Sequence, residues 1–342
     1  MPERKRQIAV LGAGAWGTVL ANLAARNEAR VTLWARDAGH AAEMAATGVN
    51  ARRLPGVPLA SNVTPTDTLA VAAEADIILL AVPTQALRPV CQALLSFVAS
   101  DIPVVICAKG IERGTGLFPS QVVAEILPEN PPAVLSGPSF AADVAKGLPT
   151  AVTLAAADHE RAAALAGTLA APWFRLYHCA DIRGVEIGGA AKNVLAIASG
   201  IAAGRGLGAS AGAALIARGF AELTRFGRAF GADPATLAGL SGLGDLVLTC
   251  TSHQSRNFSF GFALGRGASL AAASADGRLV EGVHTCGILV DLAHRKSVDM
   301  PISAAVEAVL TERIEIDAAI EALLARPAKP EFAGDVDVRL YE

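Results

Sequence analysis

Three glycines near the start of the chain constrain its fold more than any other feature. The segment Gly12-Ala-Gly-Ala-Trp-Gly17 follows the apolar residues 8–11 directly and precedes a helical pattern at residues 18–26. In such a motif the glycines permit a tight turn, close approach of a pyrophosphate and close packing of helix on strand, and the helix N-terminus attracts the anion. The strand–turn–helix context predicts a dinucleotide site. The residues expected to line it are Gly12, Gly14, Ala15, Gly17 and Trp16, with core packing as the alternative for Trp16.

Short apolar runs alternate with helical patterns through the first half of the chain. A loop rich in Pro, Gly and Asn interrupts them at residues 49–65. Such runs are typical of parallel strands buried on both faces. They predict an α/β fold that begins with a doubly wound, mostly parallel Rossmann-type sheet. The expected strands are residues 8–11, 31–34, 76–82, 103–107, 133–135 and 151–155.

The pattern changes after about residue 184, where helical spacing replaces the short apolar runs and no convincing strand follows. An all-α C-terminal domain is therefore expected, and 342 residues suit two domains of roughly 150 residues each. We predict an NAD(P)-binding domain of residues 1–183 and an α-helical substrate domain of residues 184–342, joined through a helix near residues 181–188. The expected helices are residues 186–203, 211–230, 259–264, 283–294, 301–311 and 314–324.

Composition argues against several classes of protein. A net charge of −3 provides no global basic field for nucleic acid, so an anionic substrate needs local positive charge. No uninterrupted apolar run reaches about 20 residues, which argues against a membrane span. Five widely spaced cysteines without a CxxC pair favour a reducing compartment over disulfides or zinc. We expect a cytoplasmic protein without a metal site.

Cofactor choice depends on the residues after the second predicted strand. An acid that bonds the ribose of NAD is expected about 20 residues beyond the glycines. The chain has Arg36 there, followed by Asp37. A guanidinium contacts a 2′-phosphate, which favours NADPH, whereas Asp37 keeps NADH open. A solvated charge pair is the alternative without a cofactor role.

Further motifs, in a fixed order, carry a family resemblance. They are Cys107-Ala-Lys-Gly110, Ser136-Gly-Pro-Ser-Phe-Ala141, Ala191-Lys-Asn193, residues 242–257 and Val280-Glu-Gly282. Together with the glycine turn they resemble bacterial NAD(P)-dependent glycerol-3-phosphate dehydrogenases, and residues 242–257 are the most specific part. The resemblance implies reduction of dihydroxyacetone phosphate to sn-glycerol 3-phosphate with NADPH or NADH, a homodimer, and a role in glycerophospholipid synthesis. The chain departs from the family pattern at Ala108, at His253-Gln254 and near Ser210, none of which removes a proton-transfer or phosphate group.

Four residues are assigned to catalysis by this resemblance. Lys192 would be the general acid/base, although a lysine among small and apolar neighbours also snorkels to solvent. Lys109 follows a predicted strand, at the carboxyl end where parallel sheets bind ligands. Two ammonium groups in one dry site lower each other's pKa. Asp245 would orient Lys192, with Thr249 on the same helical face; a helix N-cap is the alternative for Asp245.

Substrate and cofactor contacts complete the predicted site. Arg256 provides a planar fork for phosphate oxygens, and Asn257 adds uncharged donors. For Glu281 the alternative is an exposed carboxylate at a helix start. The expected substrate-binding residues are Lys109, Gly137, Ser139, Lys192, Asn193, Asp245, Ser255, Arg256 and Asn257. Beyond the glycine turn, the expected cofactor contacts are Arg36, Lys109, Ala141, Arg256, Leu279 and Glu281.

The sequence leaves two alternative functions open. A β-hydroxyacid or ketopantoate-type dehydrogenase shares the fold and the Lys-Asn pair, but Ser255-Arg256-Asn257 favours a phosphorylated substrate. A non-catalytic NAD(H)-sensing protein has no need of Lys109 and Lys192.

Overall fold

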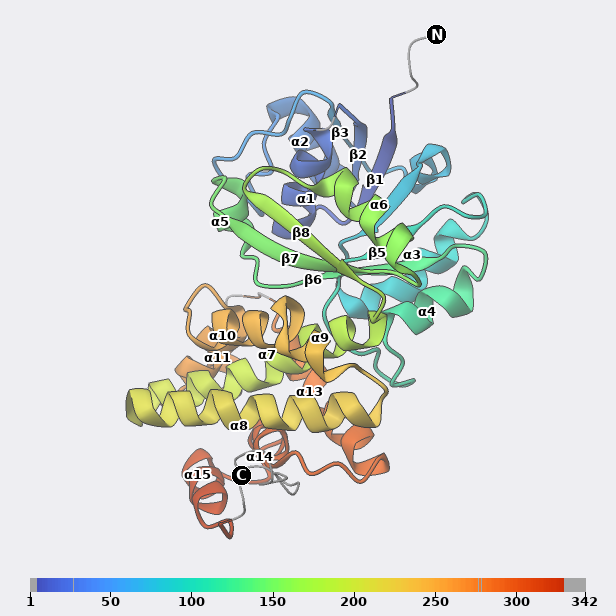
Figure 1. Ribbon diagram of the computed structural model, residues 1–342. Coiled ribbons are helices and arrows are strands. Elements are labelled where there is room, and N and C mark those ends of the chain that lie inside the picture. Colours follow the sequence, from blue (N-terminus) through green and yellow to red (C-terminus); the bar gives the residue numbers. More distant parts are fainter. Residues whose placement is uncertain (1–4, 27, 276, 278, 329–342) are drawn as a thin grey trace.

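An eight-stranded sheet forms the N-terminal part of the computed structural model, which describes residues 5–26, 28–275, 277 and 279–328. The strand order is β3-β2-β1-β4-β5-β6-β7-β8, and only the β6–β7 pair is antiparallel (Figure 1). The predicted α/β class with a doubly wound, mostly parallel sheet is confirmed. The strands are β1 (Gln7–Leu11), β2 (Arg30–Trp34), β3 (Val63–Thr66), β4 (Ile77–Leu80), β5 (Val104–Ile106), β6 (Pro132–Ser136), β7 (Thr150–Ala155) and β8 (Phe174–Cys179).

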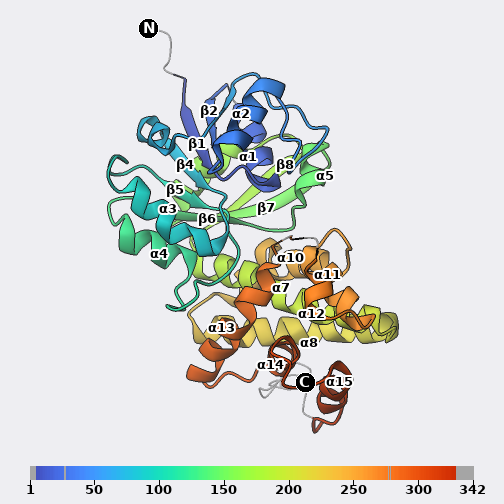
Figure 2. The ribbon, with the colours of Figure 1, turned by 180° about the vertical axis from the view of Figure 1, so that it is seen from behind.

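Both faces of this sheet are covered by helices, as Figures 1 and 2 show from opposite sides. Alternate residues of β1 point to opposite faces. Val10 belongs to the buried core cluster that includes residues of α1 (Ala15–Ala25), α2 (Ala38–Thr47) and α6 (His159–Leu169). Leu11 belongs to the cluster on the other face, which includes residues of α3 (Leu87–Leu94) and α4 (Pro119–Ile126). Three short helices complete this part: η1 (Leu69–Glu74), η2 (Thr84–Ala86) and α5 (Ala141–Ala145).

The two strands that the sequence pattern missed, β3 and β8, lie at the two edges of the sheet. β3 carries Pro65 and overlaps the end of the predicted loop at residues 49–65. Its edge position tolerates a residue without an N–H donor. β8 is buried only at Phe174 and exposes Arg175, Tyr177 and His178, so it lacks the continuous apolar run on which the prediction depended.

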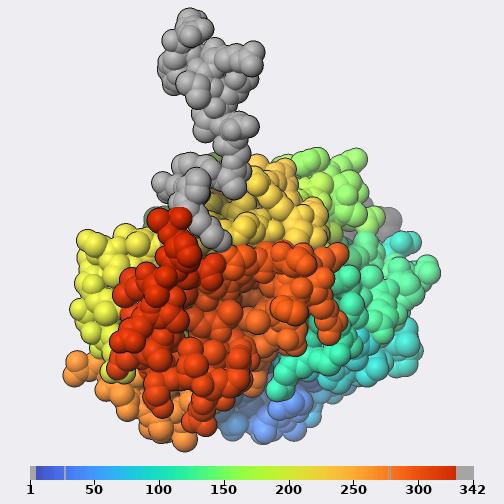
Figure 3. Space-filling model, turned by 90° about the horizontal axis from the view of Figure 1, so that it is seen from below, coloured from blue at the N-terminus to red at the C-terminus, as the bar shows by residue number. Residues whose placement is uncertain are grey.

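Every element assigned to the described residues after β8 is a helix, joined to the next by a turn or loop. These helices pack around α7, and α13, α14 and α15 form much of the face seen from below (Figure 3). α7 is long and apolar enough to cross a membrane, with a mean hydropathy of 1.2, but 94% of that window is buried inside the protein. A helix with apolar residues all round belongs in a core. The helices are α7 (Ile182–Gly204), α8 (Gly208–Ala229), α9 (Pro234–Ala238), the π-helical turn η3 (Leu240–Gly244), α10 (Asp245–Cys250), α11 (Arg256–Gly265), α12 (Leu270–Ala273), α13 (Glu281–Arg295), α14 (Pro301–Leu310) and α15 (Ile316–Leu324).

The two parts meet where β8 leads into α7, near the predicted joining helix. One turn into α7, the buried Glu186 carboxylate accepts hydrogen bonds from the Ser120 backbone N–H (2.6 Å) and hydroxyl (2.7 Å) of α4. Burial raises the pKa of Glu186 to about 7, against the opposing effect of these bonds. This contact ties the helical part to the sheet; the boundary between residues 183 and 184 stays a prediction.

Candidate active site

A buried carboxylate joins the two predicted catalytic lysines. Asp245 accepts a hydrogen bond from Lys192 Nζ at Oδ1 (2.6 Å) and one from Lys109 Nζ at Oδ2 (2.7 Å). Its side chain is 1% exposed, against 9% for Lys192 and 20% for Lys109. Lys192 therefore does not snorkel to solvent; its ammonium group forms an internal ion pair with Asp245.

Three separate elements bring these charges together. Lys192 lies in the middle of α7, Lys109 follows β5, and Asp245 is the first residue of α10. Gly244 holds the N-cap position of α10, so the alternative of Asp245 as a cap is wrong. The π-helical turn η3 immediately precedes Asp245, and such turns are frequent at functional sites.

Glycines in α7 make room for the cluster. A Cβ at Gly188 would lie 2.5 Å from the Ser241 carbonyl oxygen of η3. At Gly189 it would lie 2.9 Å from Ser136 Oγ and 3.2 Å from Lys109 Cγ. Larger residues would push η3, which leads into Asp245, and Lys109 away from Lys192. The two glycines thus have a steric role in assembling the site.

The remaining polar contacts leave hydrogens available on both ammonium groups. Lys192 Nζ also donates to Thr249 Oγ1 (2.9 Å), and Lys109 Nζ donates to the Gly137 carbonyl (3.0 Å). Each ammonium carries three hydrogens, so in the described contacts one N–H of each lysine is left for a ligand. Thr249 also lies 3.3 Å from Asp245 Oδ1, which confirms the expected shared face of α10.

Burial and the neighbouring charges set the protonation of this cluster. Burial, together with the positive charge of Lys109, lowers the pKa of Lys192 to about 8, although Asp245 opposes the shift. Burial also opposes ionisation of Asp245, but both lysines outweigh it and hold the pKa of this carboxyl below its usual value. The cluster therefore contains a firmly ionised acid and an amine that titrates near neutrality, which suits proton transfer.

A second group of predicted residues lies where α7, α11 and α13 meet. Asn257 donates from Nδ2 to Asn193 Oδ1 (2.9 Å) and accepts at Oδ1 from the Gly282 backbone N–H (2.9 Å). These bonds leave one Nδ2 hydrogen of Asn257 for a ligand. Asn257 thus ties three helices together, a role that its motif did not indicate. Ser255 is the N-cap of α11, where its hydroxyl accepts from the Phe258 N–H (3.2 Å).

Arg256 and Glu281 lie close enough for their charges to interact electrostatically, as predicted. Burial raises the pKa of Glu281 to about 7, while the Arg256 charge and the Thr84 backbone N–H act in the opposite direction. Glu281 is only partly accessible at the start of α13, so it is not an exposed helix-start carboxylate. Arg256 is exposed in the first turn of α11, whose N-terminus attracts anions.

The glycine turn has the shape that a dinucleotide requires. Gly12 has φ of +120°, and a Cβ there would lie 2.7 Å from the Ala81 carbonyl carbon. Gly14, the N-cap of α1, faces open space with no atom within 4 Å of an added Cβ. The backbone is therefore open to a pyrophosphate at a helix N-terminus. Trp16 packs its ring against Phe174 of β8, with centroids 6.3 Å apart.

Two buried hydroxyls lie beside Gly110, the residue that follows Lys109. Among the described residues, Thr84 Oγ1 and Thr285 Oγ1 are buried without a hydrogen-bond partner. Both lie beside Gly110, at 2.7 and 3.3 Å from the position of an added Cβ. Buried polar atoms are normally paired, so these two hydroxyls depart from the usual pattern close to Lys109.

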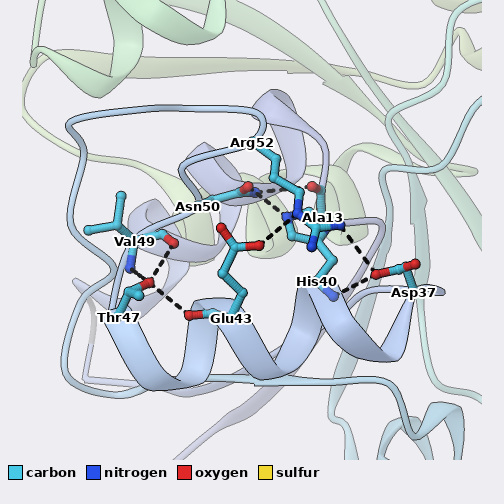
Figure 4. Close-up of polar contacts among 8 residues, drawn as sticks. All are labelled: Ala13, Asp37, His40, Glu43, Thr47, Val49, Asn50 and Arg52. Atoms are coloured by element: carbon cyan, nitrogen blue, oxygen red, sulfur yellow. Dashed lines mark hydrogen bonds and ion pairs between the residues drawn. The ribbon is translucent and has the colours of Figure 1, made fainter.

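The predicted 2′-phosphate residue lies away from the catalytic cluster, at the end of β2. Arg36 is exposed, and the next residue, Asp37, is the N-cap of α2, accepting from the His40 N–H (2.6 Å). Arg52 pairs with Asp37 (3.4 Å) and Glu43 (2.7 Å), as Figure 4 shows.

A buried network near the turn escaped the sequence motifs. Asn50 donates from Nδ2 to the Ala13 carbonyl (3.1 Å) and to Thr18 Oγ1 (2.7 Å), and its Oδ1 lies 2.8 Å from His40 Nε2. It is fully buried although it lies in a polar loop. An asparagine in such a loop resembles an ordinary turn residue, and only its burial reveals the contact with the glycine turn.

The other predicted residues take varied positions. Gly137 has φ of +144°, and its carbonyl accepts from both Lys109 and Ser139 (3.1 Å). Ala141 begins α5, and Leu279 lies two residues before α13; both are partly accessible. Across residues 5–26, 28–275, 277 and 279–328, no group of three His, Cys, Asp or Glu side chains is arranged to hold a metal ion.

Comparisons with known proteins agree with this geometry. The family model described as NAD-dependent glycerol-3-phosphate dehydrogenase N-terminus matches residues 7–162, and the C-terminus model matches residues 181–321. A glycerol-3-phosphate dehydrogenase [NAD(P)+] of Beijerinckia indica is 68% identical over 97% of this chain and 99% of its own length. The corresponding protein of Azorhizobium caulinodans is 59% identical over 95% of this chain and 98% of its length.

A solved structure extends the likeness to the whole fold. The crystal structure of glycerol-3-phosphate dehydrogenase from Coxiella burnetii superposes with a TM-score of 0.90 at 41% identity, covering 94% of this chain and 99% of that one. The resemblance predicted from the motifs is thereby confirmed. The chain belongs to the NAD-dependent glycerol-3-phosphate dehydrogenase family, whose members use NAD or NADP.

Proposed function

We propose that this protein reduces dihydroxyacetone phosphate to sn-glycerol 3-phosphate with NADPH or NADH. The observation that carries the proposal is the Lys109–Asp245–Lys192 ion-pair cluster, buried between the sheet and α7. Family membership narrows the substrate, and the N-terminus of α11 with Arg256 provides local positive charge for a phosphate in a protein of net charge −3.

The glycine turn would hold the cofactor, which when bound would supply hydride to the substrate carbonyl carbon. Lys192 Nζ donates a proton to the ketone oxygen in reduction and accepts it back in oxidation. Asp245 orients Lys192 and keeps its protonated form accessible, and Thr249 fixes the same ammonium. Lys109 adds a second positive charge, which favours a developing alkoxide.

Phosphate recognition is assigned to the first turn of α11. Arg256 would take the phosphate oxygens in its guanidinium fork, and Asn257 would offer its remaining Nδ2 hydrogen. Asn193 supports this arrangement through its bond to Asn257 (2.9 Å). The site therefore selects for a ketone that carries a phosphate at short distance from the carbonyl.

A substrate panel tests the proposal. Purified protein is given NADPH with dihydroxyacetone phosphate, unphosphorylated dihydroxyacetone or ketopantoate, and cofactor oxidation is followed at 340 nm. We expect rapid oxidation of NADPH with dihydroxyacetone phosphate and not with the other two ketones. Equal rates with the unphosphorylated ketone would refute the phosphate assignment, and faster oxidation with ketopantoate would favour the alternative dehydrogenase. No oxidation with any of the ketones would favour the NAD(H)-sensing alternative.

Cofactor preference is the second prediction. Arg36 is exposed beside the end of β2, and Asp37 is engaged as the N-cap of α2 and by Arg52. We therefore expect a higher kcat/KM with NADPH than with NADH. Arg36→Ala should lower the value for NADPH about 10- to 100-fold, since a charged hydrogen bond contributes roughly 1.5–3 kcal/mol, and leave the value for NADH nearly unchanged. Equal efficiencies with both cofactors, in parent and variant alike, would contradict this preference.

The cellular setting follows from the family and the thiols. All five cysteines are free, and four of them are buried. Burial raises the pKa of Cys107 and Cys250 to about 12. The five cysteines form no disulfide, which supports the proposed reducing, cytoplasmic location. A homodimer and a role in glycerophospholipid synthesis are carried from the family resemblance, and sedimentation of the purified protein tests the first of these.

A further inference from the structure

We propose that Arg52 is a specificity residue that favours the 2′-phosphorylated cofactor by neutralising Asp37. Its guanidinium lies between the carboxylate of Glu43 in α2 and the carboxylate of Asp37, the N-cap of α2. Nε lies 2.7 Å from Glu43 Oε2, and Nη1 lies 3.4 Å from Asp37 Oδ1 (Figure 4). The inference rests on the proposed use of NAD(P)H and adds a residue to the Arg36 assignment.

Asp37 stands where a free acid would oppose a 2′-phosphate. It is adjacent in sequence to Arg36, so the two Cα atoms are about 3.8 Å apart. In this fold an acid after the second strand bonds the ribose hydroxyl of NAD, and its charge repels a phosphate on the same hydroxyl. The Asp37 carboxylate must therefore be compensated if a 2′-phosphate is to bind beside it.

The carboxylate is also held in place. Asp37 Oδ1 accepts the N-cap hydrogen bond from the His40 N–H (2.6 Å), so rotating the side chain away would uncap α2. The charge is therefore compensated by a neighbour, and in the described contacts that neighbour is Arg52. Of the four charges Arg36, Asp37, Glu43 and Arg52, two are positive and two negative. Removing Arg52 leaves a net negative charge at this place.

Asn50, two residues before Arg52, holds this part of the chain near Asp37. The fully buried Asn50 bonds to the Ala13 carbonyl and to Thr18 Oγ1 of the glycine turn. Since both Nδ2 hydrogens are used, its Oδ1 is an acceptor, and His40 Nε2 (2.8 Å) is the donor. The Asn50 carbonyl accepts from the Arg53 and Leu54 N–H groups (3.2 and 2.8 Å). The start of this loop is thus fixed to the glycine turn and to α2.

The test measures binding and needs no turnover. Calorimetry with the full-length protein compares adenosine 2′,5′-bisphosphate with adenosine 5′-monophosphate. Arg52→Ala should lower the preference for the bisphosphate roughly five- to tenfold, because the pair is exposed and its interactions are screened. The loss should shrink as salt is raised. Arg53→Ala, at the exposed neighbouring position, is the matched control and should keep the parent preference.

A second substitution separates charge from structure. Asp37→Asn in the Arg52→Ala background should restore most of the preference, because asparagine caps a helix as well as aspartate but carries no charge. An unchanged preference in Arg52→Ala, or failure of Asp37→Asn to restore it, would overturn the inference. Equal binding of both nucleotides by the parent protein would also overturn the inference. A protein that keeps the preference yet does not reduce dihydroxyacetone phosphate would instead refute the proposed function alone.

Discussion

Replacing Lys192 with alanine should lower kcat for dihydroxyacetone phosphate reduction about 10³-fold, within the range typical of a lost general acid. The Lys192 ammonium is the buried donor that Asp245 and Thr249 orient, and neither of these neighbours replaces it as a proton source. NADPH binding should be retained, since the glycine turn lies on a separate element. Steady-state kinetics and calorimetric titration with NADPH measure the two effects independently.

Two controls accompany this substitution. Lys192→Met keeps the apolar stem within the buried helix and should lose activity equally, which shows that the amine matters rather than a cavity. Lys296→Ala removes an exposed lysine at the C-terminal end of α13 and should behave like the parent protein. Turnover within a few-fold of the parent in Lys192→Met would remove Lys192 from its role as general acid.

The pH profile of the parent protein provides a further check on the same residue. Burial lowers the pKa of Lys192 to about 8. Reduction needs the protonated amine, so its kcat/KM should fall as pH rises through about 8, whereas oxidation needs the neutral amine and should rise over the same interval. Asp245→Asn removes the charge that raises this pKa, so the alkaline decline of the reduction should move to lower pH. A decline that stays at the parent pH in Asp245→Asn would assign the titration to another group.

The central strands and long helices could be predicted from the sequence because their burial is simple. Parallel strands such as β4 and β5 are covered on both faces and therefore consist of apolar residues throughout. The edge strands β3 and β8 are covered less completely, and no continuous apolar run marks them. α11 begins three residues before the predicted helix, at Arg256, because Ser255 caps it.

The candidate site could be predicted only in part, for a related reason. Motifs identified Lys109, Lys192 and Asp245, but the bond between Lys109 and Asp245 joins residues 136 positions apart. Such a contact depends on how the sheet and α10 pack, which no local pattern records. The role of Asn50 and the Asn193–Asn257 bond could not be predicted either, because an asparagine is the same letter in the sequence whether its amide is buried or exposed in a turn. The roles of these residues stay predictions.

Replacing Arg256 with alanine should lower kcat/KM for dihydroxyacetone phosphate about 100-fold, since a bidentate charge-assisted pair contributes roughly 3 kcal/mol. Most of the loss should be in KM if the guanidinium holds the phosphate equally in the ground and transition states. The slow reduction of unphosphorylated dihydroxyacetone should be unchanged. Arg256→Lys keeps the charge without the planar fork and should recover part of the loss.

The comparison of the two ketones decides what Arg256 contacts. Because Arg256 also lies near the Glu281 carboxylate on the predicted cofactor side, its loss has a second possible consequence, weaker cofactor binding. That effect would reduce turnover of both ketones equally, whereas loss of a phosphate contact reduces only that of the phosphorylated one. Arg266→Ala, at the exposed C-cap of the same helix, controls for a general change in charge and should leave both rates unchanged. Equal losses for both ketones in Arg256→Ala would therefore move this residue from the phosphate site to the cofactor site.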